Sequence, residues 1–424
     1  MQRHSRGGGM KEITLVSPPE GGISIEALRD RVHQLRADMP EPFSDTAIQL
    51  CSDFGNALFR IAPRGSPLQT LGFFLRRAHL AELGAELARA CPRNVLYAPR
   101  GVVFLIPPGN VPALMAYSWL FAAISGNITI IRLPGAASAD VDLIVSCFEQ
   151  IFSGQPRRTF FIRYQHDDDL TAALSQLCDV RVIWGGDETV RRFQSIPLAP
   201  GARDLAFPDR YSLAVISSNR YLELSAAGRD ALIAAVYRDL YTFDQAACSS
   251  PRLLIWVGSS EQSQQASSEF YPRLSALAAS RYRCELANVI SKKVFTCEAI
   301  LDQGVDSQSF SSNQLTVLRM DRLTDLTRRH CGGGLLFEHF AESLNSIGNF
   351  ISRKDQTLSY FGFTSGELAE FARNVAGKGL DRIVPIGEAL TFSHLWDGYD
   401  LLQEFVRRVH IVPSPSALSE TAAA

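Results

Sequence analysis

The stretch Val102-Val103-Phe104-Leu105-Ile106, followed by Pro107-Pro108-Gly109-Asn110-Val111-Pro112, decides the fold class of this chain. Five successive apolar residues that end at a Pro/Gly turn are typical of a strand buried on both faces. The apolar residues from Pro112 to Ile124 then have the length of a helix. This part of the chain therefore predicts a strand, a turn and a helix, in that order.

The same alternation of short apolar strands and helical patterns continues along the chain. Further strands are predicted over Ile128–Ile131, Thr159–Ile162, Val180–Trp184, Tyr211–Ile216, Arg252–Val257, Leu315–Arg319 and Leu335–Phe337. Helices are predicted over Ile25–Met39, Leu68–Ala90, Ser138–Phe152, Leu170–Leu177, Ser225–Tyr241, Glu261–Ala279 and His339–Ile347. Such an alternation predicts an α/β fold with parallel sheets covered by helices on both faces. Ligands of these sheets bind at the carboxyl ends of the strands.

Composition narrows the class of protein further. The chain has 424 residues and a formal net charge of −2, so nothing electrostatic favours nucleic acid or an anionic membrane as a partner. The apolar residues between Gly101 and Ile131 are cut by prolines, which leaves them too short for a membrane span. Eight cysteines without a C-x-x-C pair fit reduced thiols in a cytoplasmic enzyme. We expect a flexible extension before Met10 and a disordered tail from Pro413.

Cys248 is the candidate nucleophile. It lies in Gln245-Ala246-Ala247-Cys248-Ser249, between a predicted helix and a predicted strand, where a thiol is displayed rather than packed. A buried structural cysteine is the alternative, and no histidine lies close in sequence to serve as its base. Cys331, before Gly332-Gly333-Gly334, is the best alternative thiol, and the His and carboxylate spacings match no metal site.

Three turns carry candidate binding groups. The Asn110 amide is a possible hydrogen-bond donor to an oxyanion, although Pro108-Gly109-Asn110 is also an ordinary turn. Gly185-Gly186, with Thr189, allows close approach of a ligand to a helix start, where Asp187 is a plausible N-cap; an ordinary strand–helix turn is the alternative. Arg132 follows a strand and suits a nucleotide ribose or 2′-phosphate, or is a surface arginine.

Taken together, these motifs resemble the aldehyde dehydrogenase superfamily. The motifs are P-x-N-x-P at Pro108–Pro112, the cation–Pro turn at Arg132–Pro134, the glycine turn at Trp184–Thr189 and Q-x-x-C at Gln245–Cys248. Within that superfamily the chain is most similar to the LuxC-type acyl-CoA reductases. The stretches that carry this likeness are Val182–Thr189, Phe207–Ile216, Ser352–Gly362, Leu380–Gly387 and Leu395–Tyr399, and it covers roughly residues 90 to 412.

The resemblance implies a role for each candidate residue. It places Cys248 at the nucleophile and Asn110 at the oxyanion donor. It assigns Pro108, Arg132, Gly185, Gly186 and Thr189 to the cofactor site, with no metal. Arg132 stands where the family usually has a lysine, and a guanidinium suits the extra phosphate of NADPH. The chain departs from the superfamily at two segments, E-L-G-G-K and E-x-F-G-P, which supply the hydrolytic base and the glutamate for the nicotinamide ribose.

The first departure has a chemical consequence. Phe207–Tyr211 stands in place of the segment with the base, and hydrolysis of an enzyme thioester needs an activated water. We therefore expect an NADPH-dependent reductase that converts an acyl thioester to an aldehyde through a cysteine acyl-enzyme. Its partners would be acyl-CoA or an acyl-carrier or acyltransferase protein. A redox-independent cysteine acyltransferase and a non-catalytic subunit of a multi-enzyme complex are the alternatives.

The domain expectations follow the same resemblance. Residues 1–244 should contain N-terminal helices and the nicotinamide cofactor domain, and residues 245–403 the catalytic domain with Cys248. Residues 404–424 should hold an oligomerisation strand and the tail. The family oligomerises through an added strand pair, for which Val95–Ile106 and Phe405–Val412 are candidates. We expect a homodimer or homotetramer.

Overall fold

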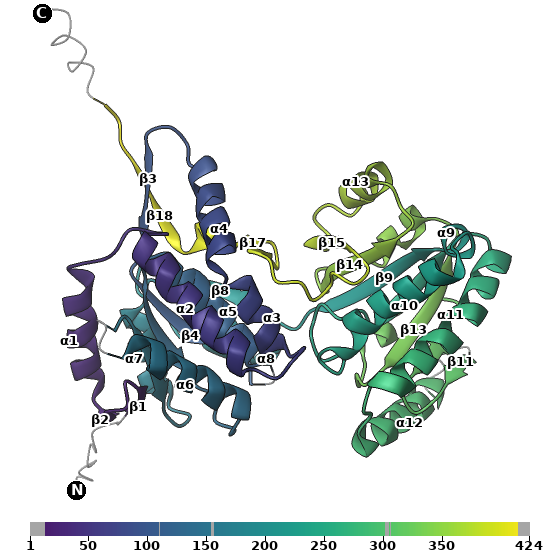
Figure 1. Ribbon diagram of the computed structural model, residues 1–424, viewed down its shortest axis with the longest axis horizontal. Coiled ribbons are helices and arrows are strands. Elements are labelled where there is room, and N and C mark those ends of the chain that lie inside the picture. The colour runs from purple at the N-terminus through teal and green to yellow at the C-terminus, as the bar shows by residue number, and fades with distance from the viewer. Residues whose placement is uncertain (1–12, 110, 154–156, 302–304, 306, 414–424) are drawn as a thin grey trace, which may run out of the picture. The chain divides into compact units, whose positions relative to one another are not determined.

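The computed structural model describes residues 13–413 except 110, 154–156, 302–304 and 306 (Figure 1). The expected N-terminal extension, nearly all of the expected tail and Asn110 lie outside the described residues. The chain divides into two compact units. Unit 1 contains Met1–Pro208 together with Tyr399–Ala424, and unit 2 contains Asp209–Gly398.

Seven strands of unit 1 form a mostly parallel sheet with the order β2-β1-β6-β5-β4-β7-β8, and β3, β17 and β18 lie outside it. The strands are β1 (Ile13–Ser17), β2 (Gly21–Ile23), β3 (Val95–Pro99), β4 (Val102–Ile106), β5 (Ile128–Arg132), β6 (Thr159–Arg163), β7 (Val180–Trp184), β8 (Arg203–Phe207), β17 (Tyr399–Asp400) and β18 (Val406–His410). The helices are α1 (Ile25–Arg36), α2 (Asp45–Ile61), α3 (Pro67–Phe74), α4 (Arg77–Arg89), α5 (Ala113–Ile124), α6 (Ala139–Phe152), α7 (Asp168–Leu177), α8 (Asp187–Gln194) and α14 (Leu401–Glu404).

Both faces of this sheet are covered by helices. One face packs against α1, α7 and α8, in a core that joins Leu28 and Phe193 to Phe104 of β4. On the other face, Trp119 of α5 makes an edge contact with Phe148 of α6 at 5.4 Å between ring centroids. Burial on two faces explains why β4 and β7 are apolar at nearly every position.

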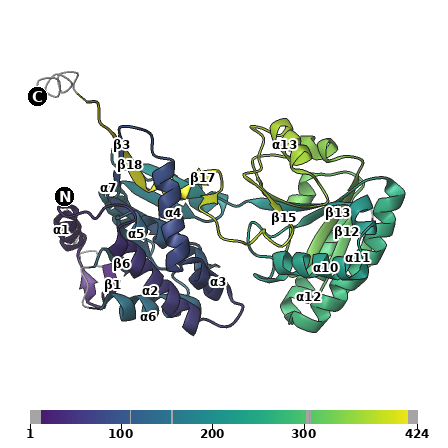
Figure 2. The ribbon, with the colours of Figure 1, turned by 45° about the horizontal axis from the view of Figure 1, so that its top comes forward.

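A separate strand pair in unit 1 joins β3 to β18. The two strands are antiparallel, with Val95 opposite His410 and Pro99 opposite Val406, and they lie side by side in Figures 1 and 2. The pairing is anchored by Asn127, whose side-chain amide donates to the Phe405 carbonyl at 2.9 Å. Of the candidate ranges Val95–Ile106 and Phe405–Val412, Val95–Pro99 and Val406–His410 thus pair within one chain, whereas Val102–Ile106 is β4 of the main sheet.

Unit 2 has a second sheet with the order β11-β12-β13-β10-β9-β14-β15, parallel except for β11. Its strands are β9 (Tyr211–Ser217), β10 (Leu253–Val257), β11 (Ser307–Ser311), β12 (Thr316–Arg319), β13 (Leu335–Ala341), β14 (Asp355–Phe361) and β15 (Arg382–Pro385), and β16 (Leu395–Trp396) lies outside the sheet. Its helices are α9 (Ser218–Leu222), α10 (Ala226–Tyr241), α11 (Ser260–Arg281), α12 (Leu286–Leu301) and α13 (Ser365–Asn374), with 3-10 helices η1 (Asp325–Arg328) and η2 (Leu344–Asn349).

The core of unit 2 also has two layers of helices. Trp256 and Leu254 of β10 pack with α10 and α11, whereas Ile255 of the same strand packs with α12, α13 and η2. Alternate residues of β10 therefore reach opposite cores, as the pleat of a strand requires.

Most predicted elements are present within a few residues, and three differences stand out. The helix predicted over His339–Ile347 is wrong, because β13 continues to Ala341 and a 3-10 helix follows. The pattern over Leu68–Ala90 forms two helices, α3 and α4, rather than one. The domain boundary expected after residue 244 differs from the observed division, because β9 pairs with β10 and β14 and so belongs with the sheet of Cys248.

Every helix within the described ranges is too short or too polar to cross a lipid bilayer.

Arg181 carries the charge that is most completely buried in unit 1. Its side chain is 0% exposed and binds Asp204 through two hydrogen bonds of 2.7 and 2.9 Å, while Ser175 and the Ile196 carbonyl accept from its third nitrogen. A buried ion pair with these extra acceptors is fully satisfied, and removal of one partner leaves the other charge uncompensated.

We predict that Arg181→Ala lowers the free energy of unfolding by about 3 kcal/mol, measured by urea denaturation. Arg192→Ala is the matched control. It breaks an exposed pair with Asp168 and should cost at most about 1 kcal/mol. Equal losses in the two variants would contradict the assignment of Arg181 to a buried network.

Candidate active site

Cys248 lies on the loop that joins α10 to β10. The loop leaves α10 through Asp244 and Gln245, which both have left-handed backbone conformations with φ of 52° and 61°. Cys248 itself is half-buried, and its carbonyl accepts a hydrogen bond of 2.6 Å from the Ser212 hydroxyl on β9. The loop is therefore fixed to the sheet at the cysteine, as a nucleophile site requires.

The side chain of Gln245 holds this loop in place. Gln245 is 0% exposed, and its amide nitrogen donates to the carbonyls of Pro251 and Leu335 at 2.9 and 2.8 Å. Its amide oxygen accepts from the Gly334 N–H at 3.0 Å. The Gln of the Q-x-x-C motif is thus a structural clamp between the cysteine loop and the start of β13.

Three glycines form the other side of this clamp. Gly332, Gly333 and Gly334 all have positive φ, and the Gly333 N–H donates to the Asp244 carbonyl at 2.9 Å. A Cβ at Gly334 would lie 2.0 Å from the Gln314 carbonyl, so only glycine fits there. Buried Lys292 donates to the Gly333 carbonyl at 2.6 Å, and its burial lowers the pKa of the ammonium.

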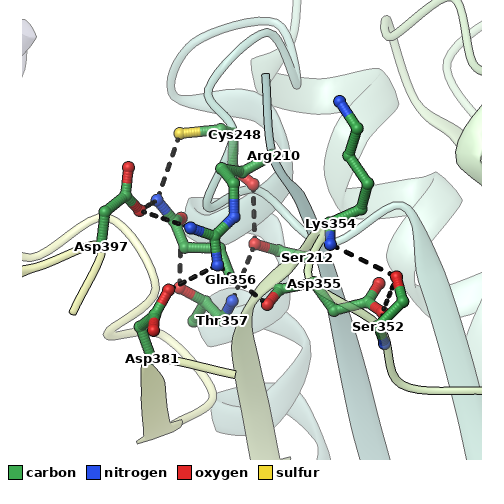
Figure 3. Close-up of polar contacts among 10 residues, drawn as sticks. All are labelled: Arg210, Ser212, Cys248, Ser352, Lys354, Asp355, Gln356, Thr357, Asp381 and Asp397. Carbon is green, nitrogen blue, oxygen red and sulfur yellow. Dashed lines mark hydrogen bonds and ion pairs between the residues drawn. The ribbon is translucent and has the colours of Figure 1, made fainter. Parts of the chain in front are cut away.

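One side chain from a distant part of unit 2 reaches the sulfur of Cys248, and a second lies behind it (Figure 3). Gln356, on β14, places its amide nitrogen 3.5 Å from Cys248 Sγ. The same nitrogen donates to Asp397 Oδ1, and Asp397 is almost fully buried. The Gln356 amide therefore bridges the thiol and a buried carboxylate.

Charged groups surround this bridge. Arg210 forms an ion pair with Asp381 and lies 4.0 Å from Asp397 Oδ1. Burial raises the pKa of Asp397 to about 6, and the Gln356 amide and Arg210 oppose that rise. Above about pH 6 this carboxylate is ionised in the folded protein.

The thiol of Cys248 is weakly acidic in this setting. Burial raises its pKa to about 11, and the charge of Asp397 adds to the rise. The Gln356 amide, followed by Arg252 and Arg210, lowers the same pKa. At neutral pH the group is a protonated thiol that becomes nucleophilic only on losing its proton.

The alternative thiol has a different environment. Cys331 is half-buried, burial raises its pKa, and Lys292 opposes the rise. The neighbouring His330 accepts a hydrogen bond of 3.1 Å from the Gly332 N–H, and its burial lowers the imidazole pKa to about 3. His330 is therefore neutral at physiological pH and serves the glycine turn.

The predicted cofactor residues gather at one edge of the unit 1 sheet. Pro108 follows β4, Arg132 ends β5 and Gly185-Gly186 follow β7. Because β5, β4 and β7 are adjacent and parallel, these residues share the carboxyl edge of the sheet. The structure thus brings together the cofactor candidates, in unit 1, and places Cys248 in unit 2.

The local geometry at this edge leaves room for a ligand. A Cβ at Gly186 would meet no heavy atom within 4 Å, and Thr189 is exposed. At Gly185 a Cβ would lie 2.9 Å from Thr189 Cγ2, so glycine permits the turn to close on α8. Gly186, rather than Asp187, is the N-cap of α8. The guanidinium of Arg132 lies over the Tyr164 ring at 4.5 Å.

The two departures from the superfamily pattern have structural counterparts. Phe207 is buried and stacks on Trp184, with ring centroids 4.0 Å apart, so this position supplies packing rather than a base. Glu338, which follows the segment Cys331–Leu336, is 0% exposed and is bound by Arg319 and by the Trp256 indole at 3.1 Å.

The sequence reasoning missed Gln356 and Asp397 as site residues. Both lie in stretches that carry the resemblance to the acyl-CoA reductases, Ser352–Gly362 and Leu395–Tyr399. The available signal was that these stretches contain polar residues that local structure does not require. Their approach to Cys248 depends on the pairing of β14 with β9, which the sequence does not reveal.

The fold is that of the aldehyde dehydrogenases. Aldehyde dehydrogenase 21 from Physcomitrella patens superposes with a TM-score of 0.64 over 95% of both chains, at 10% identity. An oxidoreductase from Marinobacter aquaeolei gives a TM-score of 0.66 over 96% of both chains, at 13% identity.

The sequence comparisons identify a narrower class of protein than the fold does. The model of the acyl-CoA reductase (LuxC) family matches residues 86–408, and the chain belongs to that family. The long-chain acyl-protein thioester reductase of Aliivibrio fischeri is 29% identical over 175 residues. That alignment covers 39% of this chain and about a third (35%) of the relative's length.

We predict that Gln245→Leu loosens the cysteine loop. It removes three buried hydrogen bonds and leaves their backbone partners unsatisfied, so the free energy of unfolding should fall by about 3 kcal/mol or more. Amide hydrogen exchange of residues 246–250 should accelerate. Gln308→Leu, on exposed β11, is the control and should leave both measurements unchanged. Unchanged exchange in Gln245→Leu would refute the clamp.

Proposed function

We propose that this protein reduces an acyl thioester to an aldehyde through an acyl-enzyme on Cys248, with NADPH as the reductant. The observation that carries the proposal is a cysteine loop held to the sheet beside a buried amide and carboxylate, in a chain of the acyl-CoA reductase family. Coenzyme A or a carrier protein would be the donor, and the relative named as an acyl-protein thioester reductase supports the latter.

The first step is transfer of the acyl group to the enzyme. Cys248 Sγ attacks the thioester carbon, its proton goes to the departing thiol, and the C–S bond of the donor breaks. One thioester replaces another, so the step is nearly balanced in energy and gains from the local position of the acyl group. We assign the oxyanion of this step to the Asn110 amide and a backbone N–H near Cys248; loss of one such donor costs about a hundredfold to thousandfold in turnover.

The second step is reduction of the acyl-enzyme. When bound, the reduced nicotinamide dinucleotide supplies the hydride for this step. The residues at the carboxyl edge of the unit 1 sheet fit such a ligand. Gly186 leaves its backbone accessible, Thr189 offers an exposed hydroxyl, and Arg132 offers a cation. Cys248 then leaves as a thiolate, the aldehyde is released, and the sulfur regains a proton from solvent. The buried Phe207 in place of a hydrolytic base supports reduction over hydrolysis.

The assembly of the protein is part of the same proposal. The β3–β18 pair exposes Leu96 and Val409, and Ile411 and Val412 follow with exposed side chains. Exposed apolar residues beside a two-stranded sheet support self-association. We propose that this pair mediates a homodimer or homotetramer.

A cysteine acyltransferase remains the second candidate, because Glu338 is engaged by Arg319 and Trp256 rather than available to a nicotinamide ribose. The two functions separate in one assay. Consumption of the thioester without a fall in NADPH absorbance would favour the acyltransferase.

We predict that Cys248→Ala abolishes both covalent labelling by radiolabelled acyl-CoA and NADPH-dependent aldehyde formation, because the nucleophile is lost. The matched control is Cys331→Ala, which removes the other half-buried thiol of the region and should retain labelling. Labelling that persists in Cys248→Ala would remove this residue from the reaction.

We predict that Arg132→Ala weakens NADPH binding about tenfold to a hundredfold and leaves NADH binding nearly unchanged, because a charged hydrogen bond to the 2′-phosphate is lost. Titration with each nucleotide in a fluorescence or calorimetric assay measures the difference. Arg163→Ala changes the exposed arginine that ends the neighbouring strand β6 and serves as control. Equal losses for NADPH and NADH would refute the phosphate contact.

A further inference from the structure

We propose that Gln356 is a catalytic residue whose side-chain N–H stabilises the Cys248 thiolate, and that Asp397 is a positioning residue that turns the Gln356 amide toward the sulfur. The inference rests on the proposed function in one respect, namely that Cys248 is the nucleophile.

The orientation of the amide is determined by its partners. An ionised carboxylate only accepts hydrogen bonds, so the group of Gln356 that faces Asp397 must be its NH₂. On the opposite side, the Thr357 hydroxyl donates to Gln356 Oε1 at 3.3 Å. The amide therefore presents its nitrogen to Cys248 Sγ at 3.5 Å, with one N–H for the carboxylate and one for the sulfur.

The support of this amide is rigid. Gln356 is 0% exposed and lies at the irregularity in register between Asp355 and Thr357, beside which β14 pairs with β9 on one side and β15 on the other. Its own carbonyl accepts from the Asp381 N–H at 2.9 Å. Thr357 N–H also reaches the Ser212 hydroxyl, which binds the carbonyl of Cys248. Ser212 thus links the strand that carries the Gln356 donor to the loop that carries Cys248 (Figure 3).

The chemistry needs such a donor twice. When Cys248 loses its proton, negative charge develops on Sγ, beside the Gln356 amide. When the reduced adduct collapses, the electron pair of the C–S bond returns to Sγ and the aldehyde departs. A fixed N–H stabilises the sulfur anion in both steps and needs no reorganisation.

The nearby charges oppose and support this role. Asp397 disfavours the thiolate, whereas Arg252 and Arg210 favour it. The charged groups that face Asp397 are Arg210, Asp381 and Arg382. Asp397 therefore has two effects of opposite sign: it orients the donor, and its charge disfavours the thiolate. Replacement by Asn removes the charge and keeps an acceptor oxygen for the Gln356 amide.

The test measures the alkylation of Cys248 by iodoacetamide in the full-length protein, by peptide mass spectrometry, across pH 5.5–9.5. Gln356→Met is close in shape and lacks the donor, so it should raise the thiol pKa. Alkylation at pH 8 should be roughly threefold to tenfold slower, because the lost thiolate fraction is partly offset by greater nucleophilicity. Cys331, alkylated in the same sample, is the internal control and should keep its rate.

Asp397→Asn should act in the opposite direction. At pH 8 alkylation of Cys248 should be roughly threefold faster than in the wild type, because a neighbouring negative charge is gone. The difference should shrink below about pH 6, where Asp397 is protonated in the wild type as well. A purely structural role for Asp397 would produce no such pH dependence.

Two results overturn the inference: an unchanged Cys248 rate in Gln356→Met, or a slower or unchanged rate at pH 8 in Asp397→Asn. If Gln356→Met also changes the alkylation rate of Cys331, the nearly isosteric Asp397→Asn variant alone decides whether the inference holds. Failure here is distinct from failure of the proposed function, because alkylation requires neither acyl donor nor NADPH. Absence of acyl labelling in the wild type would refute the proposed function, whereas the alkylation measurements would stay valid.

Discussion

The position of Cys248 depends on the buried side-chain amide of Gln245. Its three hydrogen bonds tie the loop after α10 to Gly334 and Leu335 at the start of β13. A loop with left-handed residues at its beginning would otherwise be free to open, since such conformations persist only where the surroundings hold them. The three left-handed glycines and buried Lys292 complete the same support from the other side.

The thiol environment follows from this support. Once the loop is fixed, Cys248 Sγ meets the Gln356 amide from β14, and Asp397 lies behind that amide. Burial and a neighbouring carboxylate keep the thiol protonated, while the amide and two arginines favour its anion. A restrained nucleophile suits a reaction with an activated thioester, which is itself a good acyl donor. In the proposed reaction, a base for water at the position of Phe207 would be unfavourable, because it would divert the acyl-enzyme to acid.

The sequence anticipated much of the fold and part of the site. Runs such as Val102–Ile106 and Val180–Trp184 indicate strands, because a strand covered on both faces is apolar at nearly every position. The pattern over His339–Ile347 led to the wrong prediction of a helix, because its first residues continue β13 and the rest forms a 3-10 helix. The cofactor candidates Arg132 and Gly185 could be proposed because Arg132 ends β5 and Gly185 follows β7.

The sequence by itself determined two alternating α/β regions and the family, and it singled out Cys248 as the candidate nucleophile, because these depend on local patterns and on motifs of fixed spacing. Tertiary structure alone decided what surrounds that cysteine. Gln245 became a clamp rather than an exposed motif residue, and Gln356 and Asp397, more than a hundred residues farther along, became its neighbours. The physical reason is that the register of β14 beside β9 is fixed by long-range pairing of main-chain groups, which leaves no mark on the spacing of side chains along the chain.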